Sequence, residues 1–245
     1  SGGRAIIGLG ASGPIVVKNW HSQAFDKPMT RTREAVEIIQ LALSGERVDY
    51  EGACFRLEGF RMLIRPIQDR IPIYLATLKS RAVRQTGEIA DGWLPTHVSV
   101  RNIEASRAPL VAGANAAGRD PLEIDMAALT LVACSDDGET ARALCREHLA
   151  YYIGGMGTFY HEVMHGYGYG DVADRIQSTW RNGNRAGAAD VIPRDVLDDL
   201  VVAGNRAECL AAIEARREAG ISHLVVFPPH NVSPELFVTT IEAIA

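Results

Sequence analysis

The segment IPIYLATLKSRAVRQTGEIADGWLP, residues 71–95, contains the pattern that decides the fold class. Residues 72–76 are a short apolar run that predicts a buried strand, and residues 80–89 have the spacing of a helix. Residues 92–95 predict a second short strand. A strand, a helix and another strand in this order indicate parallel pairing, because parallel strands need a crossover connection that is usually helical.

The same alternation continues in both directions along the chain. Further strands are predicted at 5–10, 126–134 and 223–228, and further helices at 28–44, 102–117, 137–152, 206–219 and 234–245. Five strands, each followed by a helix, indicate an α/β protein with a parallel sheet. Loops of varied length after the strands favour a (β/α)8 barrel of the TIM type, and a doubly wound open sheet is the alternative.

Two segments interrupt this alternation. Residues 46–66 alternate around a glycine turn and predict a hairpin insertion, and residues 154–203 predict a mostly helical insertion. We therefore expect one barrel domain over residues 1–245. A complete barrel has eight units in about 250 residues. Because five units with their insertions occupy this chain, we expect an incomplete barrel that corresponds to the C-terminal portion.

Composition excludes several classes of partner. The 245 residues carry a net charge of −5 and no block of like charges, so neither nucleic acid nor an anionic membrane is expected as a partner. No apolar run reaches the roughly 18 residues of a membrane helix. Four cysteines without CxxC spacing predict free thiols in a reducing, cytoplasmic compartment.

Two predicted strand ends have residues that suit anion binding. GLGASGP, residues 8–14, allows a ligand to approach the backbone closely, although a tight turn explains it equally well. Residues 76–81 place Lys79, Ser80 and Arg81 at a helix start, where amides and positive charge favour a phosphate. Ordinary helix capping by Thr77 or Ser80 is the alternative.

Other motifs give weaker indications of function. HEVMH, residues 161–165, matches the spacing of a zinc-protease helix, but no third ligand is evident and we expect no metal site. No G-x-S-x-G elbow supports a serine hydrolase. Core packing is the simpler role for Trp93.

Taken together, several motifs resemble the bacterial luciferase-like superfamily of flavin and deazaflavin enzymes, in the branch that uses coenzyme F420. They are GLGASGP, Asn19-Trp20-His21, KPMTRTREAVEII, the segment at 71–95, YYIGGMG at 151–157, Phe159-Tyr160 and Tyr167-Gly168-Tyr169. The resemblance implies a (β/α)8 barrel with an insertion. It begins at the family's fourth strand, so by that comparison three βα units are absent from this chain.

The resemblance also implies a cofactor site at the C-terminal strand ends. The residues that match it are Gly10, Ala11, Ser12 and Gly13 around the deazaflavin, Ala76, Thr77, Leu78, Lys79 and Ser80 around its tail and phosphate, and Trp93, Leu94, Thr96 and His97 near the same tail. Trp20 and His21 fall in the segment that borders the substrate. Gly13 stands where some relatives carry a glutamate near the reacting ring.

The function that this resemblance implies is hydride transfer between coenzyme F420 and a small organic substrate, a carbonyl, imine or activated alkene. His21 is the candidate proton donor, because a histidine can exchange a proton near neutral pH. An FMN-dependent monooxygenase is one alternative. A non-catalytic barrel fragment is another, and because open sheet edges favour pairing, we expect a homo-oligomer.

Overall fold

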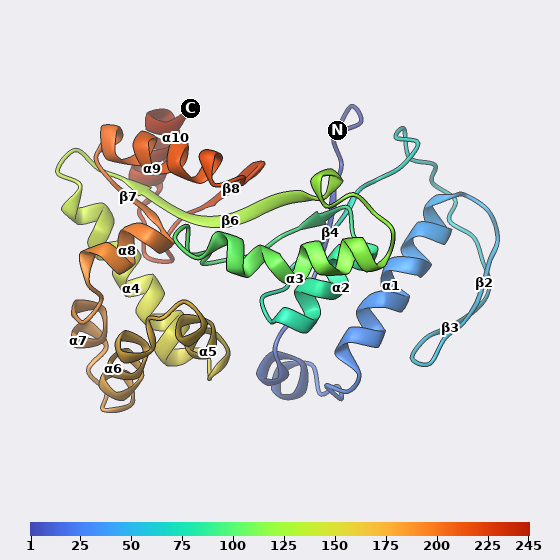
Figure 1. Ribbon diagram of the computed structural model, residues 1–245, viewed down its shortest axis with the longest axis horizontal. Coiled ribbons are helices and arrows are strands. Elements are labelled where there is room, and N and C mark those ends of the chain that lie inside the picture. Colours follow the sequence, from blue (N-terminus) through green and yellow to red (C-terminus); the bar gives the residue numbers. More distant parts are fainter. The chain divides into compact units, whose positions relative to one another are not determined.

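The computed structural model describes residues 1–245, which form two compact units. Unit 1 comprises Ser1–Pro95 and Arg107–Asp125, and unit 2 comprises Thr96–Ser106 and Met126–Ala245. Figure 1 labels most of their helices and strands. No helix combines the length and apolar character that crossing a membrane requires.

Three short parallel strands form the sheet of unit 1. β1 (Ile7–Leu9) pairs with β4 (Ile73–Leu75), and β4 pairs with β5 (Gly92–Trp93). All three residues of β4 are buried, as a strand covered on both faces requires. The parallel pairing predicted from residues 71–95 is confirmed.

Helices α1 (Pro28–Leu43) and α2 (Ser80–Ile89) of unit 1 pack on this sheet, and α3 (Ile103–Ala116), most of which belongs to unit 1, packs on α2. Two glycines allow α2 and α3 to approach closely, since a Cβ on Gly87 would lie 2.1 Å from the Leu110 carbonyl oxygen and one on Gly113 would lie 1.9 Å from that of Arg84. A short π-helical turn at Val16–Trp20 and a 3-10 turn at Pro121–Glu123 were not predicted.

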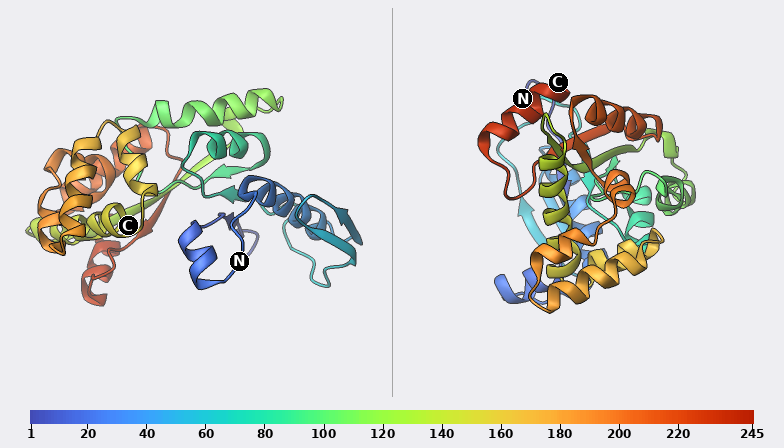
Figure 2. Two further views of the ribbon diagram at one scale, coloured as in Figure 1. Left: turned by 90° about the horizontal axis from the view of Figure 1, so that it is seen from below. Right: turned by 90° about the vertical axis from the view of Figure 1, so that its left-hand side faces the viewer.

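A hairpin lies within the predicted insertion at 46–66. β2 (Val48–Glu51) pairs antiparallel with β3 (Arg56–Phe60), and the hairpin lies beside α1, as Figure 2 shows. Buried Glu34 of α1 accepts backbone hydrogen bonds from Ala53, Cys54 and Phe55 in its turn. One carboxylate thus holds the hairpin on the helix.

Unit 2 is built on the long strand β6 (Asp125–Cys134). It pairs in parallel with β8 (His223–Phe227) along most of its length and with β7 (Val202–Gly204) at its end. β7 was not predicted. Its three residues are too few for a periodic signal, and only pairing with β6 defines it as a strand.

Helices supply the rest of unit 2. The predicted insertion at 154–203 contains α5 (Phe159–Gly166), α6 (Gly170–Arg181), α7 (Arg185–Asp190) and α8 (Arg194–Leu200). They pack with α4 (Glu139–Gly155) around a core that includes Leu149, Ile176 and Leu197. α9 (Arg206–Glu218) and α10 (Pro234–Ile244) follow β7 and β8. The four cysteines are free thiols, as predicted.

Candidate functional site

The loops after β1 and β4 lie side by side in unit 1. The Ala76 amide donates to the Leu9 carbonyl at 2.7 Å, and a Cβ built on Gly10 would lie 3.3 Å from that of Ala76. Beyond them the chain turns through Ser12 at φ +57°, and a Cβ on Gly13 would meet open space. The structure thus joins the two predicted cofactor segments, residues 10–13 and 76–80, at the C-terminal ends of adjacent strands.

Trp93 supports this loop pair from within the core. Its ring is 2% exposed, and its Nε1–H donates to the Thr77 carbonyl at 2.8 Å. The Thr77 hydroxyl is hydrogen-bonded to that of Thr86 at 2.8 Å, and the Leu94 amide donates to the Leu75 carbonyl. Trp93 and Thr77 therefore fix the backbone of the loop.

The first turn of α2 follows the second loop directly. Lys79 is the N-cap residue and no side chain caps the helix there, so the alternative of capping by Thr77 or Ser80 is wrong. Amides at the start of a helix have no partner within the helix and favour an anion. Leu78, Lys79 and Ser80, which were expected to hold a phosphate, lie at this helix start.

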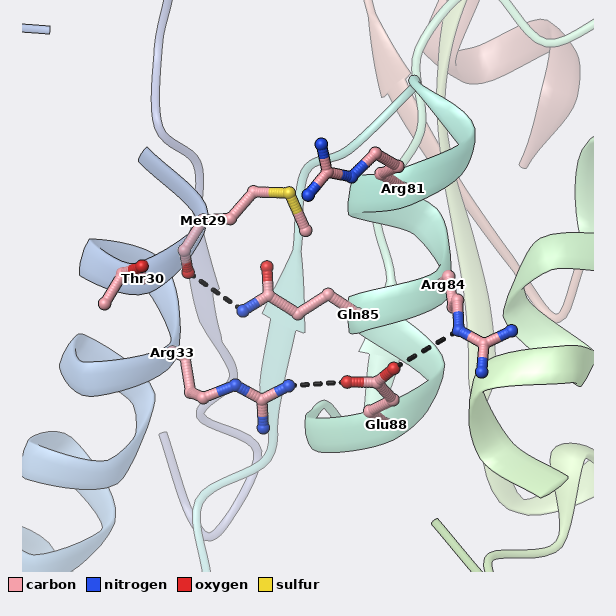
Figure 3. A pocket seen from close by; sticks show the side chains of 7 residues that line it. All are labelled: Met29, Thr30, Arg33, Arg81, Arg84, Gln85 and Glu88. Atoms are coloured by element: carbon pink, nitrogen blue, oxygen red, sulfur yellow. Dashed lines mark hydrogen bonds and ion pairs between the residues drawn. The ribbon is translucent and has the colours of Figure 1, made fainter. Parts of the chain in front are cut away.

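A cavity of about 350 Å³ lies between α1 and α2 in unit 1. In Figure 3 the Gln85 side chain reaches the Met29 carbonyl at 2.9 Å, and Glu88 bridges Arg33 and Arg84. Arg81, from the first turn of α2, lies at one end of this cavity. The Arg33–Glu88 ion pair and the Gln85–Met29 hydrogen bond join the two helices, and Arg81 adds positive charge beside the predicted phosphate segment.

Two predicted cofactor residues, Thr96 and His97, belong to unit 2. Thr96 forms a parallel bridge with Leu129 of β6. His97 follows at φ +51° and is 6% exposed, with its ring edge-on to Tyr152 and Tyr160 at centroid distances of 5.0 and 5.6 Å. A residue other than glycine in left-handed backbone is uncommon, and such residues are found more often at functional sites.

Three imidazole nitrogens in this cluster lack hydrogen-bond partners. They are Nδ1 and Nε2 of His97 and Nε2 of His148 on α4. Burial lowers the pKa of His97 to about 3 and that of His148 to about 4, so both rings are neutral near pH 7. The His230 backbone N–H donates to His148 Nδ1 at 3.2 Å, which leaves the proton of His148 on the unpartnered Nε2. A buried donor without an acceptor costs free energy, and ligand sites are a common reason for it.

The predicted substrate-side residues are on the surface of unit 1. Trp20 is 70% exposed at the end of the π-helical turn, and His21 follows it, also exposed. The His21 amide donates to the Val16 carbonyl at 3.3 Å within this turn.

Sequence reasoning assigned no role to His148, Tyr152, Tyr160 or His230. Tyr152 and Tyr160 belong to motifs that carry the family resemblance, which was the available signal. His148 and His230 had no such signal, because the hydrogen bond between them joins positions 82 residues apart in the sequence.

Known proteins resemble this chain over nearly its whole length. A coenzyme F420-dependent oxidoreductase, as it is named, of Mycobacterium tuberculosis is 33% identical and covers 92% of this chain, which spans 70% of its length. The 5,10-methylenetetrahydromethanopterin reductase of Methanolobus tindarius is 26% identical over 96% of this chain and 71% of its own.

A solved structure is also similar to this chain along its whole length. The coenzyme F420-dependent tetrahydromethanopterin reductase of Methanopyrus kandleri superposes with a TM-score of 0.81 at 26% identity, covering all of this chain and 72% of its own. The predicted fold class, α/β of the luciferase-like TIM-barrel type, is confirmed by this similarity. The luciferase-like monooxygenase model matches residues 1–223. The chain therefore belongs to the luciferase-like monooxygenase family.

Proposed function

We propose that this chain is a coenzyme F420-dependent oxidoreductase that transfers a hydride between the deazaflavin and a small organic substrate. The observation that carries the proposal is the similarity, along all of this chain, to a reductase named for its dependence on F420. The relative that is 33% identical supports the same cofactor by its name.

Each unit, taken by itself, has residues that suit such a cofactor. In unit 1, the paired loops offer open backbone at Gly13 and a helix start at α2 that no side chain caps. In unit 2, His97 and His148 have buried nitrogens that lack a partner, which a polar ring system can supply. When bound, the deazaflavin supplies the carbon that gives or takes the hydride.

Each part of the chain then has a proposed task. Residues 10–13 lie along the ring system, and residues 76–80 with the first turn of α2 hold the phosphate and tail. Trp93 and Leu94 keep the loop backbone in place. In unit 2, Thr96 and His97 are proposed as contacts of the cofactor tail, as the family resemblance implies. The neutral His148 donates an N–H hydrogen bond without adding charge, which suits an uncharged polar acceptor.

Trp20 and His21 are proposed for the substrate side, with His21 as proton donor. Their exposure leaves both accessible to a substrate. The substrate classes that match hydride transfer are a ketone, an imine and an activated alkene. We expect His21→Gln to lower the single-turnover rate more than tenfold and to leave the affinity for F420 unchanged, because proton transfer contributes to the chemical step alone.

Cofactor titration tests the proposal directly. Fluorescence titrations of the purified chain with F420 and with FMN, followed by single-turnover assays with one member of each substrate class, separate the candidates. Saturable F420 binding with oxidation of reduced F420 by one substrate supports the oxidoreductase. Binding of FMN alone favours the monooxygenase, for which the name of the matching family model is the supporting observation. Binding of neither cofactor contradicts both.

We also propose that the chain associates with a second copy of itself. Leu63, Ile64 and Ile67, which follow the hairpin, are 94%, 76% and 87% exposed, and burying such large apolar side chains against a partner would be favourable. Analytical ultracentrifugation should give a dimer or larger species, and Leu63→Lys with Ile67→Lys should shift it toward monomer. A parent chain that sediments as a monomer contradicts this proposal.

The free cysteines support a cytoplasmic location.

A further inference from the structure

Two histidines and one carboxylate meet on the surface of unit 2, outside the residues proposed for the cofactor. His161 and His165 lie one turn apart on α5, and Asp174 lies on α6. The Nε2 atoms of the two rings are 2.7 and 3.1 Å from the same oxygen, Asp174 Oδ1. One ligand atom from each residue lies within 4.8 Å of the other two.

Local packing holds this arrangement. The turn between the helices passes through Gly168 at φ +81°, and the Tyr169 amide donates to the Met164 carbonyl at 2.9 Å, which brings α6 back beside α5. Gly170 makes room for one ring, because a Cβ there would lie 2.6 Å from His165 Nδ1. The geometry therefore depends on short-range features of the chain rather than on three independent surface side chains.

We propose that His161, His165 and Asp174 bind one Zn²⁺ ion, with water completing its coordination. Two imidazoles and a carboxylate are ligands that zinc takes in proteins, at about 2.0–2.2 Å. Tetrahedral coordination places such ligand atoms about 3.4 Å apart. The present separations of 2.7 and 3.1 Å, with none beyond 4.8 Å, bracket this value, so small side-chain rotations suffice.

Exposure and charge agree with the proposal. The side chains of His165 and Asp174 are 47% and 60% exposed, so an ion has access from solvent. Asp174 contributes a carboxylate, whose negative charge is complementary to that of a divalent cation. A bound ion would also join α5 to α6, and α5 carries the Tyr160 that contacts His97.

Metal titration of the tag-free chain tests this site. The protein is dialysed against a chelator and titrated with Zn²⁺ in competition with a chromophoric chelator, and Co²⁺ is used as a spectroscopic probe. We expect one Zn²⁺ per chain and a visible Co²⁺ band. His161→Gln, His165→Gln and Asp174→Asn should each weaken binding at least tenfold, whereas His223→Gln, which removes an exposed histidine elsewhere, should not.

Gly170→Ala tests the geometry most directly, because it retains all three proposed ligands. The added Cβ displaces the His165 ring, so zinc affinity should fall, while helix content measured by circular dichroism should be unchanged. Full zinc affinity in this variant would contradict the proposed geometry.

Two further results would overturn the proposal. One is stoichiometric zinc binding that survives the His161→Gln, His165→Gln double variant. The other is the absence of stoichiometric zinc binding in a parent chain whose circular dichroism spectrum is intact. That result would mean that His161, His165 and Asp174 form only a hydrogen-bonded surface cluster. All titrations are made without F420, so their outcome is independent of the proposed oxidoreductase activity.

Discussion

The side chains of His97 and His148 are held neutral by burial among aromatic rings. Protonating either ring in place would put a charge where little solvent reaches it, and for this reason the pKa values fall to about 3 and about 4. In the unfolded chain a histidine titrates near a pKa of about 6.5. Each residue therefore links the stability of the fold to pH.

The sign of this linkage gives a prediction. Between about pH 6.5 and pH 4 the unfolded chain binds protons that the folded chain does not, so the free energy of unfolding falls as the pH falls. His97→Asn removes one such group and keeps a residue that tolerates positive φ. Urea unfolding at pH 7, 6 and 5 should show a slope smaller by up to about 1.4 kcal/mol per pH unit. An unchanged slope would contradict the neutral state assigned to His97.

At the scale of elements, one carboxylate joins the hairpin to α1. Although burial acts to raise its pKa, backbone donors at Cys54, Phe55 and Ala53 hold the pKa of Glu34 below its ordinary value. A Cβ on Gly52 would lie 2.5 Å from this carboxylate, so the turn can close on it only with glycine there.

Glu34→Gln should loosen the hairpin. The amide keeps the shape but offers one acceptor oxygen and no charge to the three backbone donors. We expect a Tm several degrees lower near pH 7, with the difference shrinking as acid protonates Glu34, since a lowered pKa stabilises only while the group is ionised. The matched control is Glu37→Gln, which alters a single hydrogen bond from Tyr50 to the same helix. An equal loss in both variants would contradict the special role of Glu34.

The start of α9 has a complete capping box. The Asn205 side chain accepts from the Glu208 amide at 3.1 Å, and Glu208 accepts from the Asn205 amide at 2.8 Å. Glu208 also pairs with Arg142 of α4 at 2.8 Å, which ties two helices of unit 2 together.

Asn205→Ala should lower the free energy of unfolding by about 1 kcal/mol, because it removes the acceptor for an otherwise unpaired amide. Asn205→Ser keeps an N-cap acceptor and should recover most of the loss. Chemical denaturation of the two variants measures the difference. Equal destabilisation by Ala and Ser would show that the cap contributes little.

At the scale of the whole molecule, cofactor binding should raise stability. A ligand that binds only the folded chain stabilises it by about 2.7 kcal/mol at one hundred times its Kd. We expect the Tm measured by differential scanning fluorimetry to rise with F420 and to stay constant with FMN. A rise with FMN alone would reverse the cofactor assignment.

Most of the architecture could be predicted from the sequence. Residues 71–95 and 126–134 have patterns long enough to define strands and helices, and their parallel pairing follows from the crossover helices. The three-residue strand β7 and the π-helical turn at Val16–Trp20 could not, because neither has a repeating pattern of its own.

The candidate site could be predicted only in part. The loops at 10–13 and 76–80 follow strands, and adjacent parallel strands place their ends together. The ring cluster around His97 was not predicted, because its members are far apart in the sequence. They are His97, His148, Tyr152, Tyr160 and Phe227. HEVMH was visible, but Asp174 is one of many acidic residues until α6 folds back on α5.

The sequence alone was enough to predict the α/β class, most of the order of strands and helices, and the family, because periodicity, turn residues and motifs are local properties. Three facts emerge only from the packed chain: His97 and His148 are neutral and keep nitrogens without a partner, Glu34 holds the hairpin, and Asp174 meets His161 and His165. These facts depend on burial and on contacts between residues distant along the chain, which exist only once the helices and strands have packed.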